Sequence, residues 1–300
     1  MTIEIENGLY ESDVSLMPYK TDIIRRHDKF VALLNAIKKS EGIENFTKSY
    51  ERFGLHVLPD NSIVGLEWVP DAEAVFLRGD FNEWMRTDFP YKKLDHGKWE
   101  INIPPNSDGS CRIRHNTKIK LAILGKETGQ LFDRISPWAH YVCQEKDTPS
   151  YDWHFYNPPI RYEPKFDRPR KVRSCRIYEA HVGISSDKEG ITSYAHFTND
   201  VLPRIAKNGY NVIQLMAIQE HAYYASFGYQ VTSFFASSSR YGTPEELREL
   251  IDTAHKYGIQ VLLDIVHSHA SSNVLDGLNN FDGTEGMAFW KFPFSVLCMQ

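Results

Sequence analysis

The 300-residue sequence lacks features that mark several classes of protein. It contains no run of 18 apolar residues, the length that a helix needs to cross a bilayer, so we expect no membrane partner. Its net charge of −5 gives no basic surface for nucleic acid, which we therefore do not expect as a partner. The acidic opening, MTIEIENGLYESD, has no apolar centre and does not fit a secretory signal peptide.

Cysteine is also scarce. The four cysteines show no CxxC pair and no spacing typical of a disulfide framework: Cys111, Cys143, Cys175 and Cys298. We interpret them as reduced thiols, which favours a cytoplasmic protein. The sequence also lacks a G-x-G-x-x-G motif after the first strand of its later α/β region, which disfavours a dinucleotide-binding sheet, and we expect no cofactor.

What the sequence contains is a series of regions with different apolar periodicities. Its composition is ordinary for a globular protein, with 42% hydrophobic and 24% charged residues. We predict an N-terminal helical segment over residues 1–50, because five apolar residues of the stretch 22–40 share one helical face. These residues are Ile23, Phe30, Leu33, Leu34 and Ile37.

Residues 51–146 change to short β-type runs separated by turn residues. The runs are SIVGLEWVP, EAVFLRG, KWEINIPP, CRIRH and KIKLAIL. Strands that recur at intervals of about ten residues predict a small immunoglobulin-like β-sandwich. Residues 147–174 are rich in Pro, Arg and aromatic residues, and we predict a linker there.

Residues 175–300 alternate strands with helices. CRIYEAHV, NVIQLMAI and IQVLLDIV are typical of buried parallel strands, and two helices separate them. The second helix has Thr243 as its N-cap, Pro244 in its first turn and Gly258 after its end. We predict an open (β/α) barrel. A complete eight-stranded barrel takes about 200 residues, whereas about 125 follow Ser174, so we expect strands 1 to 3 of an incomplete barrel.

The stretch LLDIVHSHAS places polar residues where the third strand ends, which is the edge of a parallel barrel that carries active sites. Asp264 and His269 lie there, and Tyr229 follows Gly228 in the loop after the second strand. An aromatic ring beside a carboxylate and an imidazole suits a neutral hexose. Two alternatives remain: a polar loop with a satisfied histidine, and a metal site built on the H-x-H pair of His267 and His269.

Several longer stretches carry a specific resemblance. They are RIYEAHVGISS, GYNVIQLMAIQEHAYYASFGYQVTSFFA, SRYGTPEELRELIDTAHKYGIQVLLDIVHSHAS and NNFDGT, together with YERFGLHV, EWVPDAEAVFLRGDFNEW and RISPWAHYV upstream. Over about residues 20 to 285 the chain closely resembles the eukaryotic 1,4-α-glucan (glycogen) branching enzymes of the α-amylase superfamily. GDFNEW beside EWVP is similar to the N-terminal carbohydrate-binding sandwich of that family, and DIVHSH to the first signature region of the superfamily.

The resemblance implies a function. Members of the family cleave an α-1,4-glucan and re-form an α-1,6 branch by retaining transglycosylation, so glycogen or another α-1,4-glucan is the expected partner. By this resemblance, Asp264 and His269 hydrogen-bond the sugar on the non-reducing side of the cleaved bond, and Tyr229 stacks on the same ring. The sandwich is expected to hold glucan through a second group of residues, although Trp68 is equally well explained as a core residue. This group is Trp68, Pro70, Asp95, Lys98 and Lys120.

The carboxylates that the reaction needs are not identified in this sequence. Retaining transglycosylation takes a nucleophile and an acid about 5 Å apart, and in the family these follow the fourth and fifth strands. No FRFDG-like segment occurs here, and the sequence diverges from the family after about residue 286. Asp276, Asp282 and Glu285 follow the third strand, too early for these roles. We therefore expect the catalytic pair beyond Gln300 and an inactive chain, or alternatively a non-catalytic glucan-binding module without a metal.

Overall fold

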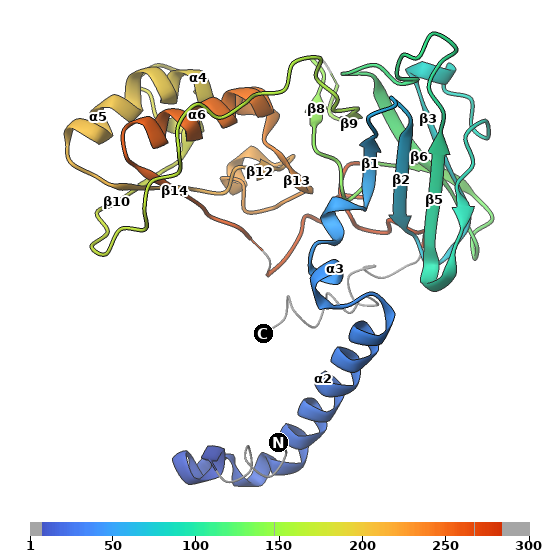
Figure 1. Ribbon diagram of the computed structural model, residues 1–300, viewed down its shortest axis with the longest axis horizontal. Coiled ribbons are helices and arrows are strands. Elements are labelled where there is room, and N and C mark those ends of the chain that lie inside the picture. Colours follow the sequence, from blue (N-terminus) through green and yellow to red (C-terminus); the bar gives the residue numbers. More distant parts are fainter. Residues whose placement is uncertain (1–7, 147, 267, 284–300) are drawn as a thin grey trace. The chain divides into compact units, whose positions relative to one another are not determined.

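The computed structural model describes residues 8–146, 148–266 and 268–283, and the chain divides into two compact units between Arg52 and Phe53. The first unit is helical, as predicted. Its main element is α2 (Lys20–Ser40), preceded by the 3₁₀ turn η1 (Val14–Tyr19) and followed by α3 (Ile43–Thr47) and η2 (Ser49–Glu51) (Figure 1). None of the residues of α2 is buried, and Phe30 is 61% exposed.

The second unit begins with a β-sandwich of two antiparallel sheets. The first sheet has the order β1-β2-β5-β4: Gly54–Val57, Ile63–Trp68, Lys98–Ile103 and Lys92–Lys93. The second has the order β3-β6-β9-β8, and β7 also pairs with β6. Its strands are Ala72–Gly79, Lys118–Gly125, Tyr151–His154, Val142–Gln144 and Leu131–Arg134. The predicted sandwich is confirmed.

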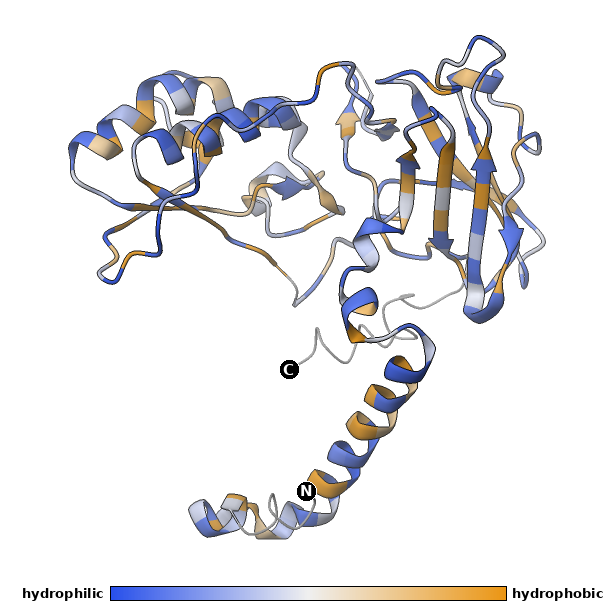
Figure 2. Cartoon of the chain, in the orientation of Figure 1, coloured by the Kyte–Doolittle hydropathy of each residue, from blue (hydrophilic) through white to orange (hydrophobic). Residues whose placement is uncertain are grey.

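Alternation of apolar and polar residues produces the sandwich core. Along β2 and β5 every second residue is buried, and Figure 2 shows hydrophobic and hydrophilic residues along the same strands. In β6, Ile119, Leu121 and Ile123 are fully buried. Two short 3₁₀ turns connect strands here, η3 (Asp80–Asn82) and η4 (Asp95–Gly97).

A carboxylic acid lies inside this core. Glu67 of β2 is 0% exposed and accepts a hydrogen bond from Ser136 Oγ at 2.6 Å. Burial raises the pKa of Glu67 to about 8, and the hydrogen bond opposes this rise only in part. The nearby Tyr91 is buried as well, and its pKa is raised by burial and by Glu67. Glu67 is therefore predominantly neutral at pH 7 in the folded protein.

Two local predictions in this region are wrong. CRIRH forms no strand: Ile113 is buried, but Arg112 and Arg114 on either side are exposed, and the segment adds to neither sheet in the described part of the chain. Conversely, residues 147–174 are not linker throughout, because β9 lies within them and pairs with β6 and β8. Tyr151 and Trp153 alternate as buried residues of β9, a pattern that the surrounding prolines hide in the sequence.

The remainder of the second unit contains a parallel sheet with the order β10-β11-β14 (Ile177–Ala180, Val212–Leu215 and Gln260–Leu263), as the sequence predicts. Its helices lie on one side of β10 and β14 in Figure 1. They are α4 (Tyr194–His196), the π-helical turn η6 (Phe197–Val201), α5 (Leu202–Lys207) and α6 (Pro244–Lys256). Thr243 and Glu246 form a capping box at the start of α6, and Gly258 follows its end with φ +71°.

An element that the sequence did not predict lies between β11 and α6. The antiparallel strands β12 (Gln219–Glu220) and β13 (Ser233–Ser237) pair within the loop, which also holds the 3₁₀ turns η7 (Tyr224–Ser226) and η8 (Ser239–Tyr241). A further 3₁₀ turn, η5 (Val182–Ile184), follows β10. The β12–β13 pair lengthens the route from the second strand to its helix and supports the segment that carries Tyr229.

The sandwich and the parallel-sheet region share a packed boundary. The Trp138 ring lies between Phe53 and Phe235 of β13, with centroid separations of 5.0 and 4.8 Å. Ala236 and Phe281 also join the hydrophobic core of the sandwich. Arg134 donates hydrogen bonds to the carbonyl of Asn280 at 3.1 and 3.3 Å. The loop after β11 therefore packs directly on the sandwich.

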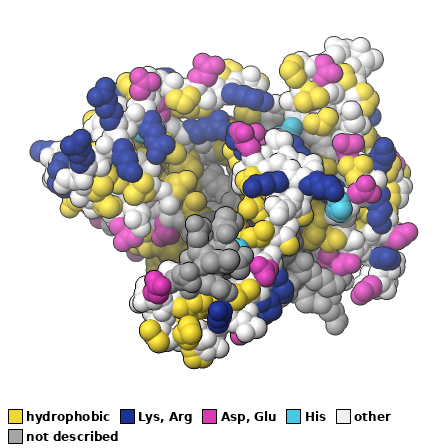
Figure 3. Space-filling view, turned by 60° about the horizontal axis from the view of Figure 1, so that its bottom comes forward, with side chains coloured by type: hydrophobic (Ala, Val, Ile, Leu, Met, Phe, Trp, Pro, Cys, Tyr) yellow, Lys and Arg dark blue, Asp and Glu magenta, His cyan; other side chains and the backbone are white. Residues whose placement is uncertain are grey.

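Charge is mixed on the molecular surface. Figure 3 shows Lys and Arg side chains interspersed with Asp, Glu and hydrophobic side chains on the face that it draws. Within the described ranges, no helix is long and apolar enough to cross a membrane. The expectation that nucleic acid is not a partner stays a prediction.

Candidate functional site

Two of the three predicted sugar-binding residues meet where neighbouring parallel strands end. Tyr229 Oη donates a hydrogen bond to Asp264 Oδ2 at 2.8 Å. Asp264 follows β14 directly, and its N–H donates to the carbonyl of Leu215, the last residue of β11, at 3.0 Å. Burial raises the pKa of Tyr229 to about 12, and the hydrogen bond with Asp264 adds to this effect. The phenol therefore remains a hydrogen-bond donor at neutral pH.

Gly228 explains how Tyr229 reaches this position. Its φ is +89°, a conformation that side chains rarely adopt, and a Cβ there would collide with the carbonyl oxygen of Ala217. The loop can thus approach the segment after β11 closely. The Tyr229 ring packs against an apolar cluster of Ala217, Val231 and Val266. Packing and the hydrogen bond together fix the ring beside the carboxylate.

His269 is placed differently. It is exposed, and its Nδ1 lies 2.8 Å from Ser268 Oγ. The described interactions of His269 include no contact with Tyr229 or Asp264. The structure therefore brings two of the three residues together and leaves the imidazole exposed on the segment that follows β14.

A buried polar network supports the loop that carries Tyr229, and the sequence interpretation missed it. Glu220 is 0% exposed and accepts hydrogen bonds from the N–H groups of His221 at 3.1 Å and Ser239 at 2.7 Å. Arg240 donates to the carbonyls of His221 and Ala222. These bonds tie the start of the loop to its end. The signal in the sequence is a glutamate soon after the apolar run NVIQLMAI and an arginine twenty residues later.

Glu220 has the shifted pKa that is typical of catalytic acids, but its surroundings argue against that role. Burial raises its pKa to about 7, while the backbone hydrogen bonds oppose the rise. Both carboxylate oxygens accept hydrogen bonds from backbone N–H groups, and no part of the residue reaches solvent. We assign Glu220 to loop closure because buried carboxylates in structural networks shift in the same way.

The predicted glucan-holding residues of the sandwich lie in two places. Trp68 of β2 is half-buried, pairs across the sheet with Lys98, and donates its indole N–H to the carbonyl of His96 at 2.9 Å. Pro70 packs beside Gly97, so the turn with the exposed Asp95 lies next to them. Lys120 belongs to the second sheet instead, where its Nζ lies 2.8 Å from Asp152 Oδ1. The other four predicted residues form a cluster, called the Trp68 cluster below, which consists of Trp68, Pro70, Asp95 and Lys98.

The alternative metal site depends on His267, which lies outside the described residues, as does Glu285. Among the residues that the structure describes, no three His, Cys, Asp or Glu side chains are grouped to hold a metal. Asp276 and Asp282 are both buried, and Asp276 Oδ1 accepts a hydrogen bond from Asn273 at 2.8 Å. Burial of this kind fits the support of a loop rather than catalysis.

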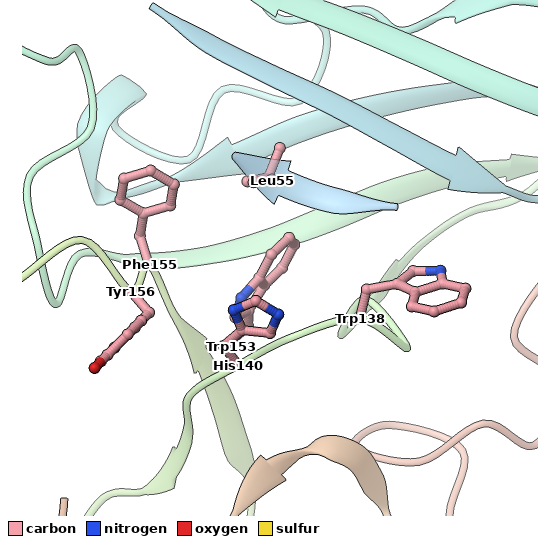
Figure 4. A pocket seen from close by; sticks show the side chains of 6 residues that line it. All are labelled: Leu55, Trp138, His140, Trp153, Phe155 and Tyr156. Atoms are coloured by element: carbon pink, nitrogen blue, oxygen red, sulfur yellow. The ribbon is translucent and has the colours of Figure 1, made fainter. Parts of the chain in front are cut away.

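A small cavity lies beside the sandwich boundary rather than at Tyr229 (Figure 4). It holds about 10 Å³ and is lined by aromatic and apolar side chains: Leu55, Trp138, His140, Trp153, Phe155 and Tyr156. That volume suits about one water molecule. The cavity is therefore too small to hold a sugar ring.

Comparison with known proteins defines the class of the two folded parts. Residues 52–139 match carbohydrate-binding module 48 (isoamylase N-terminal domain), and residues 187–279 match the α-amylase catalytic domain. A putative α-amylase of Salmonella typhimurium superposes with a TM-score of 0.59 at 19% identity, covering 73% of this chain and 34% of that one. A pullulanase in complex with maltotetraose gives 0.58 at 21% identity, with the same coverages. These structures establish the fold, a β-sandwich joined to barrel strands, and the family models assign its two parts to carbohydrate-binding module 48 and to the α-amylase catalytic domain.

Sequence relatives narrow the class to a family. The chain is 56% identical over 286 residues to a 1,4-alpha-glucan-branching enzyme of Equus caballus, covering 95% of this chain and 41% of the relative. It is 51% identical over 282 residues to one of Yarrowia lipolytica, covering 93% and 41%. Over nearly its whole length, the chain is therefore similar to part of the 1,4-alpha-glucan-branching enzymes. It spans about two fifths of the length of these curated relatives.

Proposed function

We propose that this chain is the glucan-binding portion of a 1,4-α-glucan-branching enzyme of glycogen synthesis, acting in the cytoplasm. Tyr229, Asp264 and His269 bind one glucosyl unit, and the Trp68 cluster binds glucan on the sandwich. The observation that carries the proposal is the 2.8 Å hydrogen bond from Tyr229 to Asp264 at the ends of adjacent parallel strands. It aligns an aromatic face with a carboxylate, the combination that a pyranose ring and its hydroxyls require.

The role of this pair is to hold and orient the sugar. Hydrogen bonds that Asp264 accepts from neighbouring sugar hydroxyl groups, together with the ring of Tyr229 against the sugar face, favour distortion towards an oxocarbenium-like geometry. His269 completes the set once the segment after β14 brings its imidazole to the same sugar. Cleavage and re-formation of glycosidic bonds also need a nucleophile and an acid on the two sides of the bond.

We assign neither of these two roles to the described carboxylates around the pair. Asp264 already accepts the hydrogen bond of Tyr229, and Glu220 is fully buried with both oxygens engaged. The proposal is therefore that the 300-residue chain binds glucan without forming branches. The three free cysteines of the described chain, Cys111, Cys143 and Cys175, are compatible with the cytoplasmic location.

Two variants test the binding roles separately. Tyr229→Ala removes the aromatic face and the hydrogen bond, and we expect roughly tenfold to fiftyfold weaker binding of maltotetraose by calorimetry. Trp68→Ala is expected to reduce retention of the chain in glycogen-containing native gels, because the long glucan contacts the sandwich. Tyr223→Ala is the matched control, since Tyr223 lies in the same loop and is 59% exposed. Unchanged binding in both test variants would refute the assignment.

A non-catalytic glucan-binding module is the second candidate. The observation in its favour is that the sandwich builds most of its hydrophobic core from its own residues and matches a carbohydrate-binding module over residues 52–139. This candidate predicts that Trp68→Ala abolishes all glucan binding and that Tyr229→Ala changes nothing. The proposed function predicts losses in both variants.

A further inference from the structure

A second hollow on the sandwich is large enough for a small molecule. It has a volume of about 350 Å³, the space of on the order of ten water molecules, and lies in the range of small-molecule pockets. Its lining includes Asp80, Phe81, Asn106, Cys111, Arg112 and Arg114. None of these residues belongs to the Trp68 cluster or contacts Tyr229. The roles assigned above leave this hollow without a function.

Two arginines give the hollow its character. Ile113 is 0% exposed and anchors the segment in the core, while Arg112 and Arg114 on either side of it are exposed. Arg112 Nη1 donates to Asn106 Oδ1 at 3.2 Å, and Asn106 is itself held by its hydrogen bond to Ser110 Oγ at 3.0 Å. A guanidinium has five N–H donors, so this contact orients Arg112 and leaves donors for a ligand.

The carboxylate in the lining does not cancel this charge. Asp80 Oδ1 accepts the indole N–H of Trp84 at 2.8 Å, and Oδ2 accepts the backbone N–H of Lys118 at 3.3 Å. Both oxygens therefore serve the fold of the sandwich. With two arginines and one aspartate, the lining carries a net positive charge and offers planar guanidinium groups, which favour phosphate over neutral ligands.

The apolar part of the lining indicates that the ligand is larger than a bare anion. Phe81 lies edge-to-face against Phe89, with centroids 4.9 Å apart, and this contact fixes its ring. A free phosphate would leave most of the 350 Å³ and the ring of Phe81 without a contact. A sugar attached to the phosphate supplies an apolar face for the phenylalanine and hydroxyl groups for Asn106.

We propose that this hollow binds a hexose phosphate monoester, with Arg112 and Arg114 on the phosphate and Phe81 against the sugar. Two sources share this chemistry: a free hexose phosphate, and a glucan that carries phosphate groups. The site is distinct from the proposed glucan-binding residues, so each can fail without the other.

Cys111 provides a reporter for occupancy because it lines the hollow, whereas the exposed Cys175 lies outside it. The 300-residue chain is treated with a thiol alkylator, and the rate at each cysteine is followed by mass spectrometry. We expect glucose 6-phosphate to slow alkylation of Cys111 and to leave Cys175 unchanged. Inorganic phosphate and maltotetraose at equal concentration are expected to protect Cys111 far less. Equal protection by maltotetraose would overturn the proposal, and so would equal protection by phosphate.

Variants and a second ligand complete the test. Arg112→Gln and Arg114→Gln are each expected to weaken glucose 6-phosphate binding by at least about tenfold in calorimetry, while Arg173→Gln, an exposed arginine outside the hollow, leaves it unchanged. Unweakened binding in both would refute the site. Starch-derived glucan with its natural phosphate groups, compared with the same glucan after phosphatase treatment, separates the two sources. Loss of amylose binding in Trp68→Ala with hexose phosphate binding kept would show the two sites to be independent.

Discussion

The sandwich and the parallel-sheet region of the second unit bury their apolar residues to very different extents. In the central strand β6 of the sandwich, Leu121 and its neighbours of the same face are 0% exposed. In the edge strand β14 of the parallel sheet, Leu262 and Leu263 are 41% and 48% exposed, and Ile177 of β10 is 46% exposed. The comparison teaches that the sandwich encloses its core almost entirely with its own residues, with Ala236 and Phe281 added from the neighbouring region. The parallel sheet keeps apolar side chains on both of its outer strands in contact with solvent.

This difference matters for the proposed function because the proposed sugar-binding pair, Tyr229 and Asp264, lies in the less enclosed region. The loop of Tyr229 gains support from the sandwich through the ring stack of Trp138 with Phe235 and through Tyr151, whose ring lies 5.7 Å from the Arg240 guanidinium. We infer that the sandwich stabilises the loop as well as binding glucan. Side-chain substitutions in the sandwich and in the parallel-sheet region separate the contribution to stability from the contribution to glucan binding.

The largest expected effect is on the sandwich core. Leu121→Ala removes a fully buried side chain and leaves a cavity, which lowers the free energy of unfolding by about 2–5 kcal/mol. Denaturant unfolding followed by tryptophan fluorescence measures the change. A loss below about 1 kcal/mol would contradict the view that this core carries the stability of the unit.

The next effect is a pH dependence that arises in the core of the sandwich. Glu67 has a folded-state pKa of about 8, above the ordinary value of 4.5 that applies in the unfolded chain. The folded state therefore binds more protons, so the contribution of Glu67 to stability is full below about pH 4.5 and is lost as the pH rises through 8. The loss is on the order of a few kcal/mol.

Glu67→Gln keeps the shape and the hydrogen bond with Ser136 but cannot ionise. Unfolding free energies measured between pH 5 and pH 9 should fall with pH in the natural chain, and the fall should be smaller in the variant. Parallel curves for the two proteins would show that the carboxyl does not stay neutral in the core.

A smaller effect is expected from a substitution in the Tyr229–Asp264 pair. Tyr229→Phe keeps the aromatic face and removes only the hydrogen bond to Asp264, so we expect about 1 kcal/mol weaker maltotetraose binding, roughly fivefold in Kd. Calorimetric titration gives this value. A variant that binds as weakly as Tyr229→Ala would mean that the ring itself contributes nothing to sugar affinity.

The smallest effect is the counterpart of the Leu121 substitution. Leu263→Ala makes the same chemical change in β14, but the side chain is 48% exposed, so the free energy of unfolding should change by less than about 0.5 kcal/mol. The same denaturant experiment compares the two. A loss close to that of Leu121→Ala would contradict the contrast between the two regions.

Much of this fold follows from local patterns in the sequence. The capping box and proline at the start of α6, and the continuous apolar strands on either side of it, predicted a parallel sheet that the structure confirms. The meeting of Tyr229 and Asp264 could also be anticipated, because adjacent parallel strands end at the same edge. Local periodicity and known topology were sufficient for these features.

The rest depends on contacts between residues far apart in the chain. β9 is a strand because Trp153 pairs with Ile119 and Val142, which no local pattern encodes. The closure of the Tyr229 loop requires Glu220 to reach Ser239, and a buried carboxylate of this kind resembles a catalytic residue in sequence. The resemblance places Lys120 in one group with Trp68, yet Lys120 lies in the other sheet and pairs with Asp152. Side-chain partners across sheets could not be predicted from spacing.

The most direct test of the central proposal is the number of new α-1,6 branch points that the purified 300-residue chain introduces into linear amylose, counted by debranching and chain-length analysis. The account predicts none, in a sample whose maltotetraose binding is intact. New branches would contradict it, because a nucleophile and an acid would then have to lie within these residues.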